Sequence, residues 1–383
     1  AEQQNYAEDV AGIVQNKCSS CHHPGASAPF SLMSVDEVRD SAEMIRQVVL
    51  ERRMPPWHAD PRHGSFANDR SLTQQQIDVL VDWIDQGMEV GDLAKQPPQP
   101  EFSAGWTIGQ PDIIFEMPQE VEIPASGTMP YQYFMTPTNF DEDVWISAAE
   151  AQPGNRSVVH HIICLYKDGG EKRPKDVEQQ WICGTAPGDV AFILPEGVGR
   201  RIPAHSMILW QLHYTPTGKP EKDRSRMGLK LYRGPQPPRH DVRTLNVETR
   251  RFAIPPGAKD HLVNSQRTLP QDAVLLGFMP HMHLRGKDFV YRAVFPDGRQ
   301  ETLLSVPRYD FAWQSAYRLA QPIELPKGTR LECSAHFDNS TENPANPDPS
   351  KTVVFGEQTW DEMMIGYVDL YYQQTADKTA QAQ

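Results

Sequence analysis

The residues most able to do chemistry in this 383-residue chain are cysteines, histidines and methionines grouped in short segments. The first segment is Cys18-Ser-Ser-Cys21-His22, a C-x-x-C-H sequence. Two thiols at this spacing can form thioethers to the vinyl groups of a porphyrin, and the adjacent histidine then reaches one axial face of the iron. A redox-active C-x-x-C or half of a zinc site is the alternative, but neither a second zinc-type pair nor a βαβ pattern accompanies the motif. The motif therefore predicts one covalently attached haem c with His22 as an axial ligand.

Several residues could supply the second axial ligand of that haem. Met54 lies in the sequence Arg53-Met-Pro-Pro-Trp57, where the prolines end a helix and could hold the thioether toward the iron. A thioether ligand would raise the reduction potential of the haem, whereas a second histidine would give a haem of lower potential. We expect Met54 to be the ligand. The alternatives are three further methionines and two histidines, namely Met33, Met44, Met88, His58 and His63.

Four segments in the remainder of the chain carry histidine or methionine in patterns that suit a metal ion. They are Val158-Val-His160-His161-Ile-Ile-Cys164, Gln211-Leu-His213-Tyr214, Pro280-His281-Met282-His283 and Thr359-Trp-Asp-Glu-Met363. On a strand, residues i and i+2 face the same side, so His281 and His283 can reach one metal ion. His160 and His161 are adjacent and would face opposite sides, so joint ligation requires a bulge or a local twist. Ordinary polar roles in the sheets are expected for the other histidines of this region, His205, His240, His261 and His336.

Helical patterns precede these segments and must position the C-x-x-C-H motif. Apolar residues recur on one face of residues 7–17, a second helix is predicted from Ser34 to about Arg53, and a third runs from Thr73 to a stop at Gly87. Ser34 and Thr73 each stand three residues before a Glu or Gln, which is the spacing of a capping box. Residues 95–100, KQPPQP, form a linker by composition. We therefore expect a small all-α domain over residues 1–95 and a Pro-rich linker over 96–104.

Short stretches rich in β-branched and aromatic residues alternate with Pro/Gly turns after residue 104. The chain holds 34 prolines, which disfavours long helices and central strands. Regularly spaced short strands predict antiparallel β-sandwiches, and the clearest stretches are 112–115, 157–166, 206–214, 274–279 and 329–337. A Pro-rich break at residues 234–238 divides the region into two all-β domains, 105–238 and 239–373. A polar tail, 374–383, is expected to be disordered.

Composition narrows the classes of partner. With 37 Lys and Arg against 50 Asp and Glu, the net charge is −13, which argues against nucleic acid or an anionic membrane as the main partner. The longest apolar runs, such as Ala273–Met279, are too short to span a bilayer. The chain begins at Ala1 without an initiator methionine, so we expect a periplasmic or secreted protein whose leader has been removed.

The order and spacing of these segments resemble two known families. Residues 5–95 resemble a small class I cytochrome c. Residues 105–372, about seventy per cent of the chain, resemble the type II copper, ascorbate-dependent monooxygenases that hydroxylate peptidylglycine or dopamine. The sequence Leu194-Pro-Glu-Gly-Val-Gly199 and the aromatic stretch Tyr367–Tyr372 are further landmarks of the second resemblance.

The second resemblance implies two jelly-roll sandwiches joined side by side, each with one copper. Electrons would pass from one copper to the other across a solvent-filled cleft. Imidazole suits both oxidation states of copper, and a thioether favours Cu(I). The resemblance assigns the electron-transfer copper to His160, His161 and His213, and the oxygen-binding copper to His281, His283 and Met363. Tyr367 matches a tyrosine of the family's active site.

Three positions depart from the peptide-amidating members of that family. Their substrate-binding arginine is Met279 here, their asparagine is Ile365, and the cysteine after the methionine ligand is Met364, which leaves Cys333 without its family partner. A peptide C-terminal glycine is therefore not supported as the substrate. In an oxidising compartment Cys164 and Cys183 are candidates for a disulfide with each other, and free thiols are the alternative.

Together these features predict a monooxygenase that hydroxylates a C–H bond with O2, in which the haem supplies electrons to the two coppers. The substrate, either a small molecule or peptide-like, is not specified by the sequence, and the reductant would be a redox partner protein or a small molecule. A non-catalytic redox protein that shuttles electrons or binds copper, and an O2-reducing peroxide generator, are the alternatives.

Overall fold

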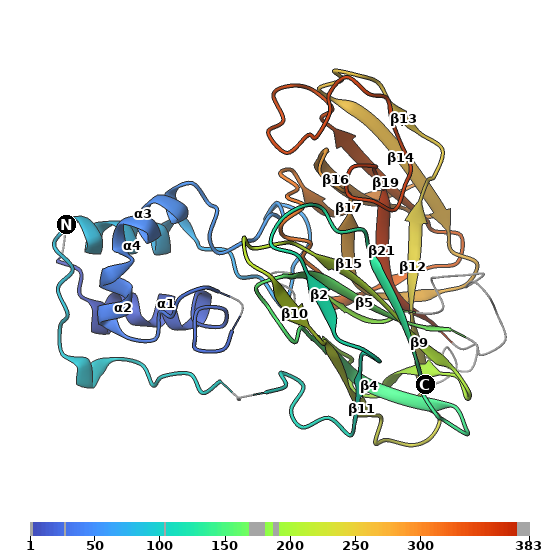
Figure 1. Ribbon diagram of the computed structural model, residues 1–383, viewed down its shortest axis with the longest axis horizontal. Coiled ribbons are helices and arrows are strands. Elements are labelled where there is room, and N and C mark those ends of the chain that lie inside the picture. The colour runs from blue at the N-terminus through green and yellow to red at the C-terminus, as the bar shows by residue number, and fades with distance from the viewer. Residues whose placement is uncertain (1–2, 27, 103–104, 168–180, 187–190, 374–383) are drawn as a thin grey trace. The chain divides into compact units, whose positions relative to one another are not determined.

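The computed structural model describes residues 3–26, 28–102, 105–167, 181–186 and 191–373 (Figure 1). The chain forms two compact units, Ala1–Trp57 with Asp69–Gly105, and His58–Asn68 with Trp106–Gln383. The predicted tail, 374–383, lies outside the described residues. None of the helices in the described part of the chain has the length and apolar character needed to cross a membrane.

The first unit is built from helices. They are η1 (Tyr6–Val10), α1 (Ala11–Lys17), α2 (Val35–Asp40), α3 (Ala42–Leu50), α4 (Gln74–Asp85) and η2 (Leu93–Lys95). The two predicted capping boxes are present, because Ser34 and Thr73 each accept a hydrogen bond from the backbone N–H three residues on. The predicted second helix is broken into α2 and α3 at Ser41. Gly87 ends the α4 segment with φ +97°, a conformation that favours glycine.

A single apolar core holds the first unit together. Val10 and Val14 of the first helical segment pack in the same cluster as Leu80 and Trp83 of α4. Trp83 is fully buried, and its indole N–H donates to the Glu89 carbonyl. This packing fixes the segment that follows α1, which is where the C-x-x-C-H motif lies.

The second unit is built from strands. Its first half contains β1 (Ile113–Glu116), β2 (Val121–Ile123), β3 (Gln132–Pro137), β4 (Val144–Gln152), β5 (Val159–Lys167), β6 (Trp181–Thr185), β7 (Phe192–Ile193), β8 (Val198–Ile202), β9 (Met207–Tyr214), β10 (Glu221–Asp223) and β11 (Arg226–Leu231). Its second half contains β12 (His240–Glu248), β13 (Ala253–Ile254), β14 (His261–Thr268), β15 (Ala273–His281), β16 (Gly286–Val294), β17 (Gln300–Val306), β18 (Tyr317–Leu325), β19 (Arg330–Phe337), β20 (Val353–Val354) and β21 (Ile365–Tyr372). The five stretches predicted as strands appear as β1, β5, β9, β15 and β19.

Each half of the second unit has two facing sheets. In the first half, one apolar cluster joins residues of β1, β4, β8 and β11 to residues of β3, β5, β6 and β9. In the second half, Phe278 of β15 contacts Tyr291 of β16 with ring centroids 4.8 Å apart, which links the β12-β21-β15-β18 sheet to the β14-β19-β16-β17 sheet. These layers are β-sandwiches, as the strand pattern predicts.

The two sandwiches share one continuous sheet, which the sequence did not predict. Strands β8 and β12 pair in parallel, with His240 opposite Val198 and Asp241 opposite Gly199. The resulting strand order is β1-β11-β4-β8-β12-β21-β15-β18, with β7 pairing with β4. Because this sheet runs through both halves, β5 and β9 of one sandwich and β15 of the other are held in one unit (Figure 1).

A segment from the N-terminal part of the chain belongs to this second unit. Residues 58–68 lie beside β18, where the Ala67 N–H donates to the Arg318 carbonyl and the Ala320 N–H donates to the Ser65 carbonyl, each at 2.8 Å. The Asn68 side chain accepts a hydrogen bond from the Arg318 N–H at 3.0 Å. These bonds extend the edge of the sheet by a short stretch of backbone.

Candidate metal centres

The first histidine set lies on strands β5 and β9 of the first sandwich. In the β5–β9 ladder Val159 pairs with Tyr214 and His161 pairs with His213, so His160 is an extra residue at a bulge. Adjacent strand residues normally face opposite sides of a sheet, but the bulge turns His160 to the side on which His161 lies. One potential ligand atom from each of His160, His161 and His213 lies within 4.8 Å of the other two.

The ring nitrogens of this set suit a metal ion. Nδ1 of His160 and Nδ1 of His161 face one another at 3.3 Å. Among the described residues, buried Nδ1 of His213 has no hydrogen-bond partner. Burial lowers the pKa of His160 and of His213 to about 4, and burial with neighbouring imidazoles lowers the pKa of His161 well below its usual value. The imidazoles are therefore neutral at pH 7, which is the state that binds a metal.

The second histidine set lies at the end of β15 and just after it. The rings of His281 and His283 are 5.2 Å apart. Nδ1 of His281 lies 2.7 Å from Oε1 of Gln314, and Nδ1 of His283 lies 3.3 Å from the Asp361 carbonyl. Both oxygens are acceptors, so each Nδ1 carries the proton and each Nε2 is left with a free lone pair.

Two further properties prepare this second set for a metal. Buried Nε2 of His283 has no hydrogen-bond partner among the described residues. Burial lowers the pKa of His281 to about 4 and that of His283 to about 3, so both rings are neutral at pH 7. A copper ion fits both histidine sets on the chemistry of their free ring nitrogens.

Glu362 contacts both chain segments of the second centre, the one with His283 and the one with Met363. Its fully buried carboxylate accepts hydrogen bonds from the backbone N–H groups of His283 at 2.8 Å, Arg285 at 2.7 Å and Met363 at 3.3 Å. Burial raises the pKa of Glu362 to about 8, whereas these donors and the Arg285 guanidinium lower it. One side chain thus positions the backbone of His283 and of Met363.

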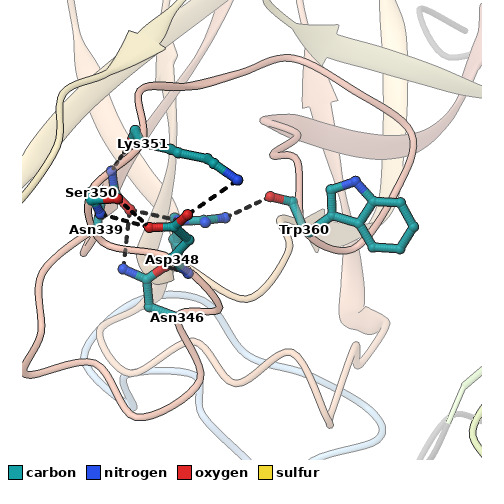
Figure 2. Close-up of polar contacts among 7 residues, drawn as sticks. Asn339, Asn346, Asp348, Ser350, Lys351 and Trp360 are labelled. Atoms are coloured by element: carbon teal, nitrogen blue, oxygen red, sulfur yellow. Dashed lines mark hydrogen bonds and ion pairs between the residues drawn. The ribbon is translucent and has the colours of Figure 1, made fainter. Parts of the chain in front are cut away.

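The Arg285 guanidinium extends this support into the neighbouring loops. Its Nε donates to Oδ1 of Asn339 and one terminal nitrogen donates to the Trp360 carbonyl, both at 2.9 Å. Asn339 also accepts a hydrogen bond from the Asn346 amide, and Figure 2 shows these two residues together with Trp360. Next to them Asp348 contacts Ser350 and Lys351, and the Ser350 hydroxyl is the main cause that lowers the pKa of Asp348 to about 2.

Met363 and Tyr367 complete the residues assigned to the second centre. Met363 is half-buried and is connected to His283 through Glu362. Tyr367 lies on β21, where it pairs with Met279 of β15, and its ring is 6.3 Å from the ring of His281. Ligation of a metal by Met363 stays a prediction, and so does a catalytic role of Tyr367.

One aromatic residue contacts both histidine sets. The Phe311 ring stacks on His160 with centroids 5.1 Å apart and an angle of 14°, and it meets His283 edge-on at 6.0 Å. Tyr131 packs against the first set, 5.3 Å from His161 and 5.0 Å from His213. The resemblance implies a solvent-filled cleft between the two sets, whereas this structure has the Phe311 ring in contact with both.

The C-x-x-C-H motif lies directly after α1 in the first unit. The N–H groups of Cys21 and His22 both donate to the Cys18 carbonyl, which closes the motif into a tight turn. Nδ1 of His22 lies 3.1 Å from the Phe30 carbonyl, so Nδ1 carries the proton and Nε2 is available to an iron. Burial raises the pKa of Cys18 to about 12, as expected for a thiol in apolar surroundings. A thioether-bound haem fits this arrangement.

The candidates for the second haem ligand fall in both units. The Met54 N–H donates to the Val48 carbonyl in the first unit. His58 and His63 belong to the 58–68 segment of the second unit. Ligation by Met54 stays a prediction.

Two expectations about side chains outside the centres can be compared with the structure. Cys164 and Cys183 are directly opposite on β5 and β6, and both are buried free thiols here, so their disulfide stays a prediction. His336, expected to be an ordinary polar residue, has its Nδ1 2.8 Å from Asp288.

Several residues at the centres were not predicted as contributors. Gln314 and Phe311 lie in the connection between β17 and β18, where the sequence carries no metal-binding pattern. For Glu362 the sequence carried a weak indication, because this acid directly precedes the predicted ligand Met363 and a buried acid requires a partner.

One comparison with known proteins covers the part of the chain that carries the second histidine set. Residues 242–383 match the family model of the copper type II ascorbate-dependent monooxygenase C-terminal domain. No curated protein matches the chain.

Three solved structures that the chain resembles are distant from it in sequence and in fold. The infectious bursal disease virus VP2 subviral particle has 7% identity and a TM-score of 0.21, with 69% of this chain and 73% of that chain covered. The VP54 protein of the virus PBCV-1 has 8% identity and a TM-score of 0.23, with 68% and 93% covered. A putative secreted protein from Parabacteroides distasonis has 6% identity and a TM-score of 0.16, with 68% and 89% covered. The family match over residues 242–383 supports the type II copper monooxygenase family for this chain.

Proposed function

We propose that this protein is a haem-c-fused dicopper monooxygenase that hydroxylates a C–H bond with O2. The observation that carries the proposal is the pair of neighbouring sets of neutral imidazoles with free ring nitrogens, His160, His161 and His213 in one and His281 and His283 in the other. The family match covers the second set. We place the protein in the periplasm or outside the cell.

Each set would hold one copper ion, with Met363 as the third ligand of the second. Bound copper would supply the one-electron redox chemistry and the activation of O2. The chain's own contribution is positioning. Gln314 orients the His281 ring, and Glu362 fixes the backbone on either side of the site. The Phe311 ring covers a face of His160 and excludes water there.

The proposed haem on Cys18, Cys21 and His22 would supply electrons, which a redox partner protein or a small reductant would provide. A single chain that carries both kinds of centre keeps them at high effective concentration, which favours internal transfer. Met54 is the proposed second axial ligand.

The test is O2 consumption by copper-loaded protein with ascorbate as reductant, with bound copper and H2O2 quantified. We expect two coppers per chain, and His283→Ala should lose one copper and the O2 consumption. His336→Ala is the matched control, because His336 lies in the same sandwich with a carboxylate partner, and it should retain both. If His283→Ala loses one copper but the parent consumes no O2, the result would support a copper-binding or electron-shuttle role. If all the O2 that the parent consumes is recovered as H2O2, the result would support the peroxide generator.

The haem step has its own test. Stopped-flow reoxidation of the ferrous haem by O2 should be faster in copper-loaded than in copper-free protein, and His283→Ala should abolish the gain. Reoxidation that is indifferent to copper would contradict internal transfer.

A further inference from the structure

A large cavity opens in the second unit beside the second histidine set. Its volume is about 500 Å³, within the range of small-molecule sites. The lining residues are mainly apolar and aromatic and come from both sandwiches, with Phe192 and Leu194 from the first and Leu276 and Met279 from the second. The cavity can therefore surround a ligand with apolar surface.

The position of two lining residues connects the cavity to the second centre. Met279 and His281 are two apart on β15 and face the same side of the sheet. Met279 pairs with Tyr367 of β21, and both line the cavity. Since the Tyr367 ring is 6.3 Å from the His281 ring, a molecule in the cavity lies against residues that adjoin the centre.

The two charged residues of the lining are already engaged with other protein groups. The Arg318 guanidinium donates to the Ala191 carbonyl. The Asp369 carboxylate accepts hydrogen bonds from the Thr244 hydroxyl and from Arg200. A charged ligand would have to compete with these partners, whereas an uncharged ligand leaves them intact.

Part of the wall comes from the segment 58–68. Ala67 lines the cavity, and the hydrogen bonds of Ala67 and Asn68 to Arg318 hold it there. Phe66 forms a bridge to Leu319, another lining residue. The chain thus uses residues from between the helices of its N-terminal part to complete the cavity.

We propose that this cavity binds an uncharged, largely apolar molecule, and that Ala67 and its neighbours form part of its rim. The proposal rests on the proposed function in one respect, which is that the bound molecule would be the substrate. Binding itself requires no copper.

The test uses two fluorescent probes that share a ring system. N-phenyl-1-naphthylamine is uncharged, and 8-anilino-1-naphthalenesulfonate is the same ring system with a sulfonate. Both are titrated into metal-free and copper-loaded full-length protein. We expect the uncharged probe to bind at least about tenfold more tightly than the sulfonate.

Variants that fill the cavity identify the site of binding. Leu276→Trp and Ala67→Trp should each weaken binding of the uncharged probe by at least about tenfold. Leu262→Trp and Ala253→Trp are matched controls at exposed strand positions and should leave binding unchanged. Ala67 is exposed at the rim, so its variant should fold even if Leu276→Trp does not.

The outcomes separate this proposal from the proposed function. Equal or tighter binding of the sulfonate, or binding that neither cavity variant weakens, would overturn the cavity proposal even if copper-dependent O2 consumption is present. Probe binding that is weakened by each cavity variant that folds would uphold it even if no O2 is consumed, and only the monooxygenase function would then fail.

Discussion

Replacement of Glu362 should show how strongly the second centre depends on one buried carboxylate. The carboxylate accepts three backbone hydrogen bonds, from His283, Arg285 and Met363, and it faces the buried Arg285 side chain. Glu362→Ala leaves all three donors without this acceptor and removes the group that faces the buried Arg285 guanidinium. Glu362→Gln keeps one acceptor oxygen but places an amide NH2 against the remaining donors.

The magnitude follows from these contacts. An unsatisfied buried donor costs about 1–3 kcal/mol. Glu362→Ala leaves three such donors, which are neighbours, so their costs overlap rather than add. We expect Glu362→Ala to lower the free energy of unfolding by about 3–5 kcal/mol. Glu362→Gln should lower it by about 1–3 kcal/mol.

Urea denaturation of the metal-free variants measures the loss, and hydrogen exchange of the peptides covering 281–287 and 360–366 locates it. The backbone N–H groups of His283, Arg285 and Met363 should lose protection from hydrogen exchange, and copper should bind more weakly at the second centre only. Glu122→Gln is the control, because Glu122 is 85% exposed and should change stability by less than about 0.5 kcal/mol. If Glu362→Ala unfolds at the parent's urea midpoint with unchanged protection, the carboxylate does not support the centre and our reasoning is refuted.

Three further predictions concern the histidine sets. Phe311→Leu removes ring contacts worth about 0.5–1.5 kcal/mol, so copper affinity, measured by titration, should fall by up to about tenfold. Phe252→Leu is the control, because it removes the ring of another stacked pair and should leave copper affinity unchanged. Gln314→Leu removes the acceptor of the His281 Nδ1 proton and should weaken copper binding by about 10–100-fold. Gln314→Glu keeps an acceptor oxygen and should restore copper binding. Equal copper affinities of the parent and Gln314→Leu would contradict the positioning role. Metal-free protein should lose stability as the pH falls from about 6.5 to about 4 in urea melts. The pKa of His281 is about 4 in the folded protein and near 6.5 in the unfolded protein, so the unfolded state binds more protons in that window. Protonation of this residue alone should lower the free energy of unfolding by on the order of 3 kcal/mol. A urea midpoint that stays constant over this pH range would contradict the prediction.

Local patterns predicted much of the secondary structure. The capping boxes at Ser34 and Thr73 start helices because they satisfy N–H groups within four residues of themselves. The break at Ser41 was missed, since nothing in the apolar pattern from Ser34 to Arg53 marks it. The parallel pairing of β8 with β12 was missed because it joins segments that no turn connects.

The candidate centres were predictable to the extent that ligands recur at short spacings. His281 and His283 follow from the period of a strand, whereas the use of both His160 and His161 depends on a bulge whose position the strand pattern does not specify. Gln314 reaches His281 across a sequence separation of 33 residues, and Phe311 reaches His160 across a far longer one. Contacts of that kind depend on tertiary packing, which composition and periodicity do not encode.

The two histidine sets are held by different physical means, and this bears on how each would treat a metal. The rings of His281 and His283 have their Nδ1 protons bonded to fixed oxygens, so the orientation of each Nε2 is set before any metal arrives. In the first set, the Nδ1 atoms of His160 and His161 face each other and buried Nδ1 of His213 has no partner among the described residues. Such a group costs free energy until a metal or a proton satisfies it. Buried Nε2 of His283 in the second set likewise has no partner among the described residues, so a metal would satisfy one such atom in each set. The difference between the sets therefore lies in orientation, because in the described part of the chain only His281 and His283 have ring positions that hydrogen bonds to fixed oxygens set in advance.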